Sequence, residues 1–190
     1  MSITLGRTTW RLIKAATSEE EDFNDAVVIK AFNRFANQAK AIILDPDGDK
    51  KLTYTKGYLV EVQAHPEGTS PWYTLIGGFV VDTIQRDNEL EISILSHDFW
   101  LRKRAVFKSY TNEYISDILE NLIDDLTPLV WDAGLVTVLN DIQITRTWKG
   151  ETLDVVIGEL ANMSGEEEFG AQSDLKFYFN ERDTVEADRN

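Results

Sequence analysis

The residue types that most often carry catalysis are scarce in this chain. It has no cysteine and only two histidines, His65 and His97, each placed where a predicted strand ends. Neither has a second histidine or a carboxylate at a metal-ligand spacing, and no nucleophile-elbow, zinc-protease or phosphate-loop motif is present. We interpret both histidines as surface or sheet-edge residues. We therefore expect no catalytic residue and no cofactor.

A short acidic segment gives a weak candidate for a metal site. Asp45, Asp47 and Asp49 have the opening spacing of a calcium-binding loop. The match then fails, because Lys50 stands where the loop needs a glycine and Lys56 where it needs a bidentate glutamate. The proline and the glycine of the segment favour a tight turn instead. Paired carboxylates could also serve a glycoside hydrolase, but nothing selects a pair among the 33 acidic residues.

Basic and aromatic residues point to contact surfaces rather than to chemistry. The one dense basic cluster comprises Arg102, Lys103, Arg104 and Lys108. In so acidic a chain we expect it to pair with acidic residues of a neighbouring element or subunit. The five tryptophans are most simply core residues, and an exposed one would mark an interface. The candidate interface residues are Trp72, Tyr73, Phe99, Trp100, Arg102 and Arg104.

The composition argues against several classes of protein. The chain has 190 residues, 43% of them hydrophobic and 27% charged, which is enough for a hydrophobic core and unlike a disordered or low-complexity chain. Its net charge of −14 argues against nucleic-acid binding and docking on anionic lipid, and hints at a high-salt host. No stretch approaches the ~20 apolar residues of a membrane helix. The N-terminus lacks a signal-peptide pattern, so we expect neither membrane insertion nor secretion by that route.

The first half of the chain is typical of antiparallel strands. About six segments with period-2 alternation fill residues 8–97, and the clearest are 72–85 and 89–97, joined by a short hairpin loop. The pair Gly77-Gly78 predicts a bulge or a sharp bend within the first of these two. The acidic run at 19–22 predicts an exposed loop. This spacing of strands indicates a small closed or nearly closed antiparallel β-barrel.

The pattern changes after residue 98. Thr111 is the expected cap of a helix with an apolar stripe, and Thr152 is the expected cap of a second helix that stops at Ser164-Gly165. Strands are predicted at 135–139, 142–148, 166–169 and 175–180. The predicted fold class is therefore mostly β with an α+β appendage. We expect a barrel domain at 1–108 and an α+β domain at 109–190.

The order of these features matches a known family more closely than any single motif does. The pieces are, in order, Trp10 in a strand, the acidic loop, the turn Asp45–Asp49, the strands Lys56–Val62, Leu75–Asp82 and Glu89–Ser96, a short helical segment with Leu101, the helix Tyr110–Leu119, Trp148–Leu153, the helix end Leu160–Gly165 and the strands to Phe179. Over about residues 7–180 the chain resembles the tail hub proteins of tailed viruses and related contractile injection machines, the baseplate-hub and late-control families.

This resemblance implies a role in assembly. In hub proteins the barrel is a tube module, and its copies assemble side by side into a ring that continues the tail tube. The α+β part decorates the outside or the distal end of that ring. The implied partners are further copies of the chain, the tail tube protein, the tape-measure protein and tip or baseplate proteins, with DNA passing through the ring. The implied location is the distal end of the virion tail, and the host cytoplasm during assembly.

The chain departs from the family pattern in one respect. Full hub proteins usually carry a second barrel after the α+β part, which makes a trimer pseudo-hexagonal, and the present sequence contains none up to Asn190. Rings of three and of six copies are both open, and a second barrel on another polypeptide is a further alternative. The leading hypothesis is a non-enzymatic tail hub protein. The alternative is a receptor- or glycan-binding module in which Trp72 and Tyr73 stack on sugar, and a carboxylate-based hydrolase comes third.

Overall fold

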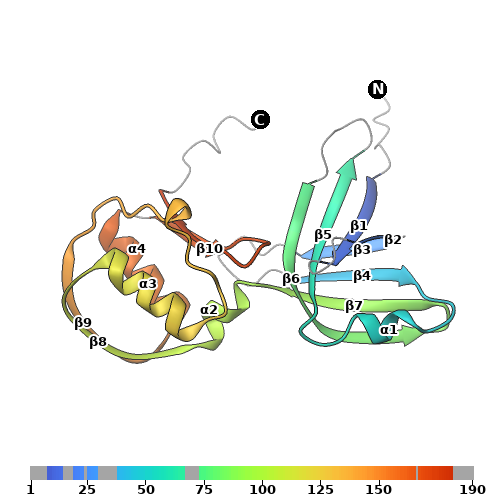
Figure 1. Cartoon of the computed structure of the whole chain (residues 1–190), viewed down its shortest axis with the longest axis horizontal. Helices are drawn as coiled ribbons and strands as arrows, with labels where there is room; N and C mark the ends of the chain where they lie inside the picture. Colours follow the sequence, from blue (N-terminus) through green and yellow to red (C-terminus); the bar gives the residue numbers. More distant parts are fainter. Residues whose placement is uncertain are drawn as a thin grey trace. The chain divides into compact units, whose positions relative to one another are not determined.

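The chain folds into two compact units, Met1–His97 and Asp98–Asn190 (Figure 1). The computed structural model describes residues 8–14, 19–23, 25–29, 38–66, 73–165 and 167–181. The first unit ends at residue 97 and the second begins at residue 98, whereas the domain boundary was predicted at residue 108. Residue 108 lies inside a strand of the second unit, and the strand that pairs with it is more than thirty residues further along the chain. Such a long-range pairing has no local signal in the sequence.

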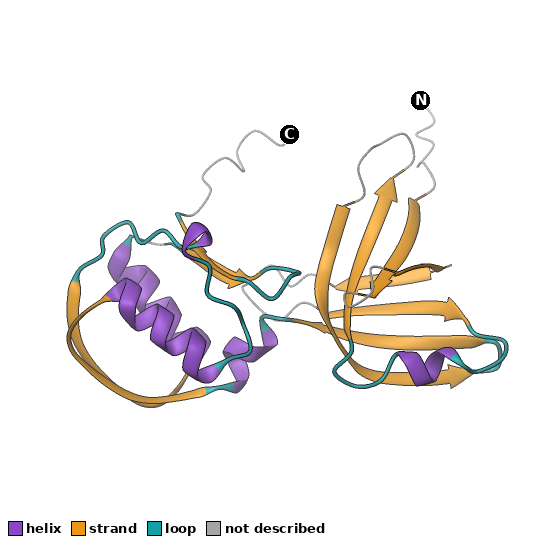
Figure 2. Cartoon of the chain, viewed as in Figure 1, coloured by secondary structure: helices purple, strands orange, loops and turns teal. Residues whose placement is uncertain are grey.

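The first unit is one seven-stranded antiparallel sheet, with the strand order β2-β1-β5-β6-β7-β4-β3. Figure 2 shows these strands with the single helical turn α1 (Lys50–Thr53) that leads from β4 to β5. The strands are β1 (Thr8–Lys14), β2 (Glu19–Phe23), β3 (Asp25–Ile29), β4 (Gln38–Leu44), β5 (Leu59–Pro66), β6 (Tyr73–Arg86) and β7 (Glu89–Ser96). The predicted mostly β, antiparallel character is confirmed.

The acidic run at 19–22 is a strand, and the prediction of an exposed loop was wrong. β2 pairs with β1, and the register sets Glu19 opposite Lys14 and Asp22 opposite Arg11. The ladder with β1 thus makes this segment a strand despite the low strand propensity of acidic residues. The run taken alone gives no signal of this pairing.

Alternating side chains of the sheet build the core of the first unit. Along β4, Ala39, Ala41 and Ile43 are buried, and the register sets them opposite Ile94, Ile92 and Leu90 of β7. Burying a Leu or Ile side chain of this kind contributes roughly 1.5–3 kcal/mol to stability. The remaining core members come from β1, β5, β6 and the residue after α1: Leu12, Tyr54, Val60, Val62, Ile76 and Val80. The predicted period-2 alternation is confirmed in these strands.

The sheet is curled, but the described residues show no closed barrel. β2 and β3 stand at the two ends of the strand order, and no ladder joins them in the part of the chain that the structure describes. Residues of β2 nevertheless come within 8 Å of β4, the strand next to the far end, as measured between Cα atoms. The two ends of the sheet therefore approach each other without an inter-strand hydrogen-bond ladder between them.

The double glycine lies where β6 changes partners. β6 pairs with β5 from Tyr73 to Phe79 and with β7 from Gly78 to Arg86, and a bulge interrupts the second ladder between Val80 and Asp82. The predicted bulge is therefore present in β6, but after Val80 rather than at the double glycine itself. A Cβ on Gly78 would overlap the carbonyl oxygen of Leu95 and would stand 2.8 Å from the carbonyl carbon. The absence of a side chain therefore permits the close approach of β7.

His97 ends the first unit as a core residue, contrary to the expectation of a surface histidine. It is 1% exposed, and its ring stacks on Phe79 at a centroid distance of 6.4 Å. Its position at a strand end was predicted correctly. Its burial depends on the long-range pairing of β6 with β7, which puts Phe79 beside the end of the strand.

The second unit packs two helices against a two-stranded ribbon. Figure 1 shows β8 and β9 curving around α3 and α4, and the core between them is formed mainly by Ile118, Leu122, Val156 and Leu160. No helix in the described ranges is long and apolar enough to cross a membrane. The elements are α2 (Phe99–Lys103), β8 (Ala105–Tyr114), α3 (Ile115–Leu126), the 3-10 turn Ala133–Leu135, β9 (Gln143–Thr152), α4 (Leu153–Ser164), β10 (Glu168–Ala171) and β11 (Phe177–Asn180).

Helix α3 begins later than predicted because its cap comes from a distant segment. The expected cap, Thr111, lies within β8, and the helix starts at Ile115. The backbone N–H of Ser116 donates to Oδ1 of Asp141 at 3.0 Å, and the Ser116 hydroxyl donates to Oδ2 at 2.7 Å. Asp141 thus satisfies an otherwise unpaired helix-end donor. The start of α4 after Thr152 and its end at Gly165 agree with the prediction.

The predicted strand at 135–139 is absent, whereas the other three predicted strands of this unit are present with shifted ends. The segment has a 3-10 turn at Ala133–Leu135 and a single parallel bridge from Val136 to Phe179. The side chain of Asp132 accepts from the Gly134 N–H at 3.0 Å and so favours the turn. The short apolar run therefore packs as an irregular connection rather than as a strand.

Replacing Gly78 by alanine should destabilise the first unit by about 3 kcal/mol or more, because β6 and β7 would have to separate. Urea unfolding of the full chain, followed by circular dichroism, measures the effect. Gly158→Ala in α4 is the matched control: its Cβ would meet the Phe169 ring at an ordinary 3.9 Å, so better helix propensity should raise stability by up to about 1 kcal/mol. Equal effects of the two substitutions would contradict this explanation.

Candidate interaction surface

The short helix α2 and the residue after it gather three of the predicted interface residues, Phe99, Trp100 and Arg104, into one place. Two cation–π pairs form at i, i+4 spacing, with the Lys103 Nζ 5.3 Å from the centre of the Phe99 ring and the Arg104 guanidinium 5.5 Å from the centre of the Trp100 ring. The two rings meet edge to face at 5.9 Å. We call Phe99, Trp100, Lys103 and Arg104 the α2 patch. Each stacked cation is held in a restricted position, which lowers the entropy lost on binding a partner.

Packing on the opposite side of α2 fixes the patch to the second unit. Leu101 is 2% exposed and belongs to the core of this unit. Arg102 turns away from the patch, and its Nε lies 3.9 Å from Oδ2 of Asp154 in the first turn of α4. The Leu153 N–H donates to the Arg104 carbonyl at 2.8 Å. The exposed part of α2 therefore consists of Lys103 and Arg104 above two half-buried rings.

The assignment of these residues to an interface stays a prediction, and the structure shows only where they lie. Phe99, Trp100 and Arg104 come together, and Arg102 is joined to Asp154. Trp72 lies outside the described residues, and Tyr73 belongs to β6 with a side chain that is not described. Lys103 was not among the predicted interface residues, although the i, i+4 spacing of aromatic and basic residues is a signal for it.

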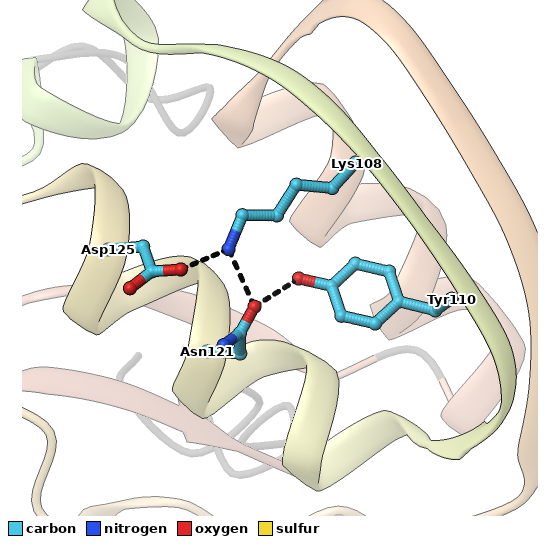
Figure 3. Close-up of polar contacts among 4 residues, drawn as sticks. All are labelled: Lys108, Tyr110, Asn121 and Asp125. Carbon is cyan, nitrogen blue, oxygen red and sulfur yellow. Dashed lines mark hydrogen bonds and ion pairs between the residues drawn. The ribbon is translucent and has the colours of Figure 1, made fainter.

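The fourth member of the basic cluster, Lys108, belongs to a polar network that joins β8 to α3 (Figure 3). Its Nζ donates to Oδ1 of Asn121 at 2.6 Å and forms an ion pair with Asp125. The Tyr110 hydroxyl donates to the same Asn121 oxygen at 2.6 Å. Figure 3 shows the two strand residues reaching toward the two helix residues. Lys108 is thus paired within its own unit, in agreement with the expected pairing on a neighbouring element.

Burial sets the electrostatics of Tyr110. Burial, together with the negative charge of Asp125, raises the pKa of the Tyr110 phenol to about 12. Its ring packs edge to face against Trp148 at 6.0 Å. The Trp148 Nε1 donates to Oε2 of Glu159 at 2.9 Å, so the network continues to α4. These residues hold the two helices on the ribbon and have no geometry that indicates a reaction.

The weak metal candidate forms a turn. Asp45 is 2% exposed, and its Oδ1 accepts from the Lys50 N–H at 3.2 Å, while Asp47 and Asp49 are exposed. The Gly48 N–H donates to the Asp45 carbonyl at 3.3 Å, as in a tight turn. Among the described residues, no group of three or more His, Asp or Glu side chains is placed to share a metal ion.

Comparisons with known proteins support the fold of the whole chain. No family model and no curated protein matches the sequence. The 43 kDa tail protein of prophage MuSo2 from Shewanella oneidensis matches with a TM-score of 0.62 at 12% identity, covering 92% of this chain and 55% of that one. The tail protein from Neisseria meningitidis MC58 matches with a TM-score of 0.64 at 14% identity, covering 90% and 50%.

A third match comes from a secretion machine. The E. coli c3393 protein, a type VI secretion component described as structurally similar to T4 bacteriophage tail proteins, gives a TM-score of 0.52 at 9% identity over 93% of this chain and 45% of that one. This chain spans about half the length of these solved structures. The resemblance to tail hub proteins is confirmed at the level of fold: the chain has a fold found in phage tail proteins.

The buried phenol predicts a specific loss of stability in alkali. Because the pKa of Tyr110 is raised above the 10.0 of an exposed tyrosine, its stabilising effect is complete below pH 10 and is lost as the pH rises toward 12. Ultraviolet titration should show a tyrosine step at about pH 12 that is missing in Tyr110→Phe. Urea unfolding from pH 9 to 12 should show a smaller pH dependence in this variant. If the step that Tyr110→Phe lacks lies near pH 10 instead, the phenol of Tyr110 is not buried.

Proposed function

We propose that this chain is a non-enzymatic structural protein of a viral tail, which forms the hub ring at the distal end of the tail tube and connects the tube to the tip or baseplate. The observation that carries the proposal is the fold likeness to two prophage tail proteins, which extends over both units and 90% or more of the chain. A likeness that keeps both units in order supports a shared architecture better than one confined to a single sheet.

In this proposal the first unit is the tube module. Its curled sheet acts as one segment of a ring, and copies meet side by side so that closed rotational symmetry completes the wall. The edges of the sheet, which no described strand covers, are natural places for such contacts. A net charge of −14 suits a ring through which DNA passes, because like charge keeps the DNA from binding.

The number of copies in the ring is three or six. The chain spans about half the length of the tail proteins it resembles. The other proposed partners are the tail tube protein, the tape-measure protein and tip or baseplate proteins. The α2 patch is a proposed contact surface within this assembly. The protein acts at the distal end of the virion tail and assembles in the host cytoplasm.

The two alternatives have less support. The receptor- or glycan-binding module depended on Trp72 and Tyr73, whose side chains are not described. A carboxylate hydrolase would need two facing carboxylates about 5–10 Å apart, and no observation selects such a pair. The structural role is therefore the one that the fold supports best.

The full chain, purified at micromolar concentration, should form closed rings of three or six copies. Native mass spectrometry gives the copy number, and negative-stain electron microscopy shows whether the assembly is closed. Addition of the tail tube protein of the same virus should place these rings at tube ends. A chain that stays monomeric at all concentrations and never binds tubes would overturn the proposal.

A further inference from the structure

The outer face of α3 carries carboxylates that have no cation in the described part of the chain. Asp117, Glu120 and Asp124 are exposed, and their spacing of three and four residues sets them along one stripe of the helix. No hydrogen bond or ion pair involves these three side chains among the described residues. The neighbouring Asp125 differs, because Lys108 pairs with it (Figure 3).

The end of this stripe is electrostatically unfavourable in a single copy. Glu120 and Asp124 are like charges at i, i+4, an arrangement that destabilises a helix. Asp124 also lies in the last turn, where the helix dipole is negative, and that turn has no basic residue of its own. A cation supplied from outside would relieve both effects. We call Glu120 and Asp124 the α3 acidic pair.

The α2 patch has the complementary property. Lys103 and Arg104 are exposed, and neither has an ion pair with a described carboxylate, although the chain has 33 acidic residues and 19 basic ones. The two patches are thus complementary in charge.

We propose that the α2 patch of one copy binds the α3 acidic pair of a second copy. Within one copy the two patches make no ion pair in the described structure, so the contact would form between molecules. Two different patches meeting in this way make a head-to-tail contact, which closes into a ring when the rotation permits. The inference rests on the proposed function and adds a contact between the second units of neighbouring copies to the proposed contacts of the sheet edges.

Charge reversal tests the contact in the full chain. The variants Lys103→Glu/Arg104→Glu and Glu120→Lys/Asp124→Lys should each weaken self-association at least about tenfold, because each turns attraction into repulsion. Sedimentation velocity over a range of concentrations measures this. Asp124→Lys suits the helix dipole, so circular dichroism and thermal unfolding should show a folded variant. Raising the salt concentration should weaken the wild-type contact.

Mixing the two variants gives the decisive test. In the mixture, the reversed α2 patch of one variant faces the reversed α3 acidic pair of the other, and the two native patches also face each other, so association should return. A single chain with all four substitutions should also associate. Lys51→Glu/Lys56→Glu is the matched control, because these two lysines are also exposed, have no ion pair with a described residue and lie in the first unit. This control should associate like the wild type.

The outcomes separate this inference from the proposed function. If Lys103→Glu/Arg104→Glu associates like the wild type, or if the mixture and the fourfold variant fail to recover, the inference is wrong while the ring proposal stands. If the wild-type α2 patch instead binds a different acidic tail protein, and the mixture of variants does not regain association, a second copy is rejected as the occupant of the patch. If the wild type does not self-associate, the proposed ring itself is wrong.

Discussion

β2 and β3 are separated by one residue in the chain, yet they pair at opposite ends of a seven-stranded sheet. In a flat sheet the first and seventh strands would lie about 29 Å apart, at roughly 4.8 Å per strand. Two Cα–Cα steps span at most about 7.6 Å. The covalent chain therefore forces the sheet to curl until its ends are neighbours, and the close approach of β2 to β4 agrees with this.

The curl of the sheet constrains the packing and the bends of the rest of the first unit. A curled sheet has an inner face, and the apolar residues of β4, β6 and β7 fill it. It also needs positions at which a strand can bend and neighbours can come close, and Gly78 with the following bulge meets that need. The same geometry explains the burial of His97 against Phe79 at the end of β7. A wall segment of this kind fits the proposed assembly of the chain with copies of itself.

The second unit uses its charges differently. Lys108 and Arg146 hold the helices to the ribbon through Asp125 and Glu159, so those cations are occupied. The α2 patch keeps two cations stacked on aromatic rings and free of ion pairs with described residues. In the proposed structural role, this exposed surface is the one that a partner covers.

Local patterns in the sequence predicted the elements whose stability is local. The alternation of β4 and β7 and the stripe of α4 were correct because one face of each element is apolar. The errors occurred where another segment decides the structure: β1 pairs with the acidic run, and Asp141 caps α3. The α2 patch was partly predictable from its i, i+4 spacing, whereas the attachment of Arg102 to Asp154 depends on the packing of α4.

The central claim is that copies of this chain form a ring in a viral tail. Electron cryo-microscopy of the intact particle, with the chain located by a bound antibody fragment, tests it most directly. The account predicts a closed ring of three or six copies at the distal end of the tail tube, with the first units side by side in its wall. Single copies on fibres or on the capsid, or no copy in the particle, would contradict it.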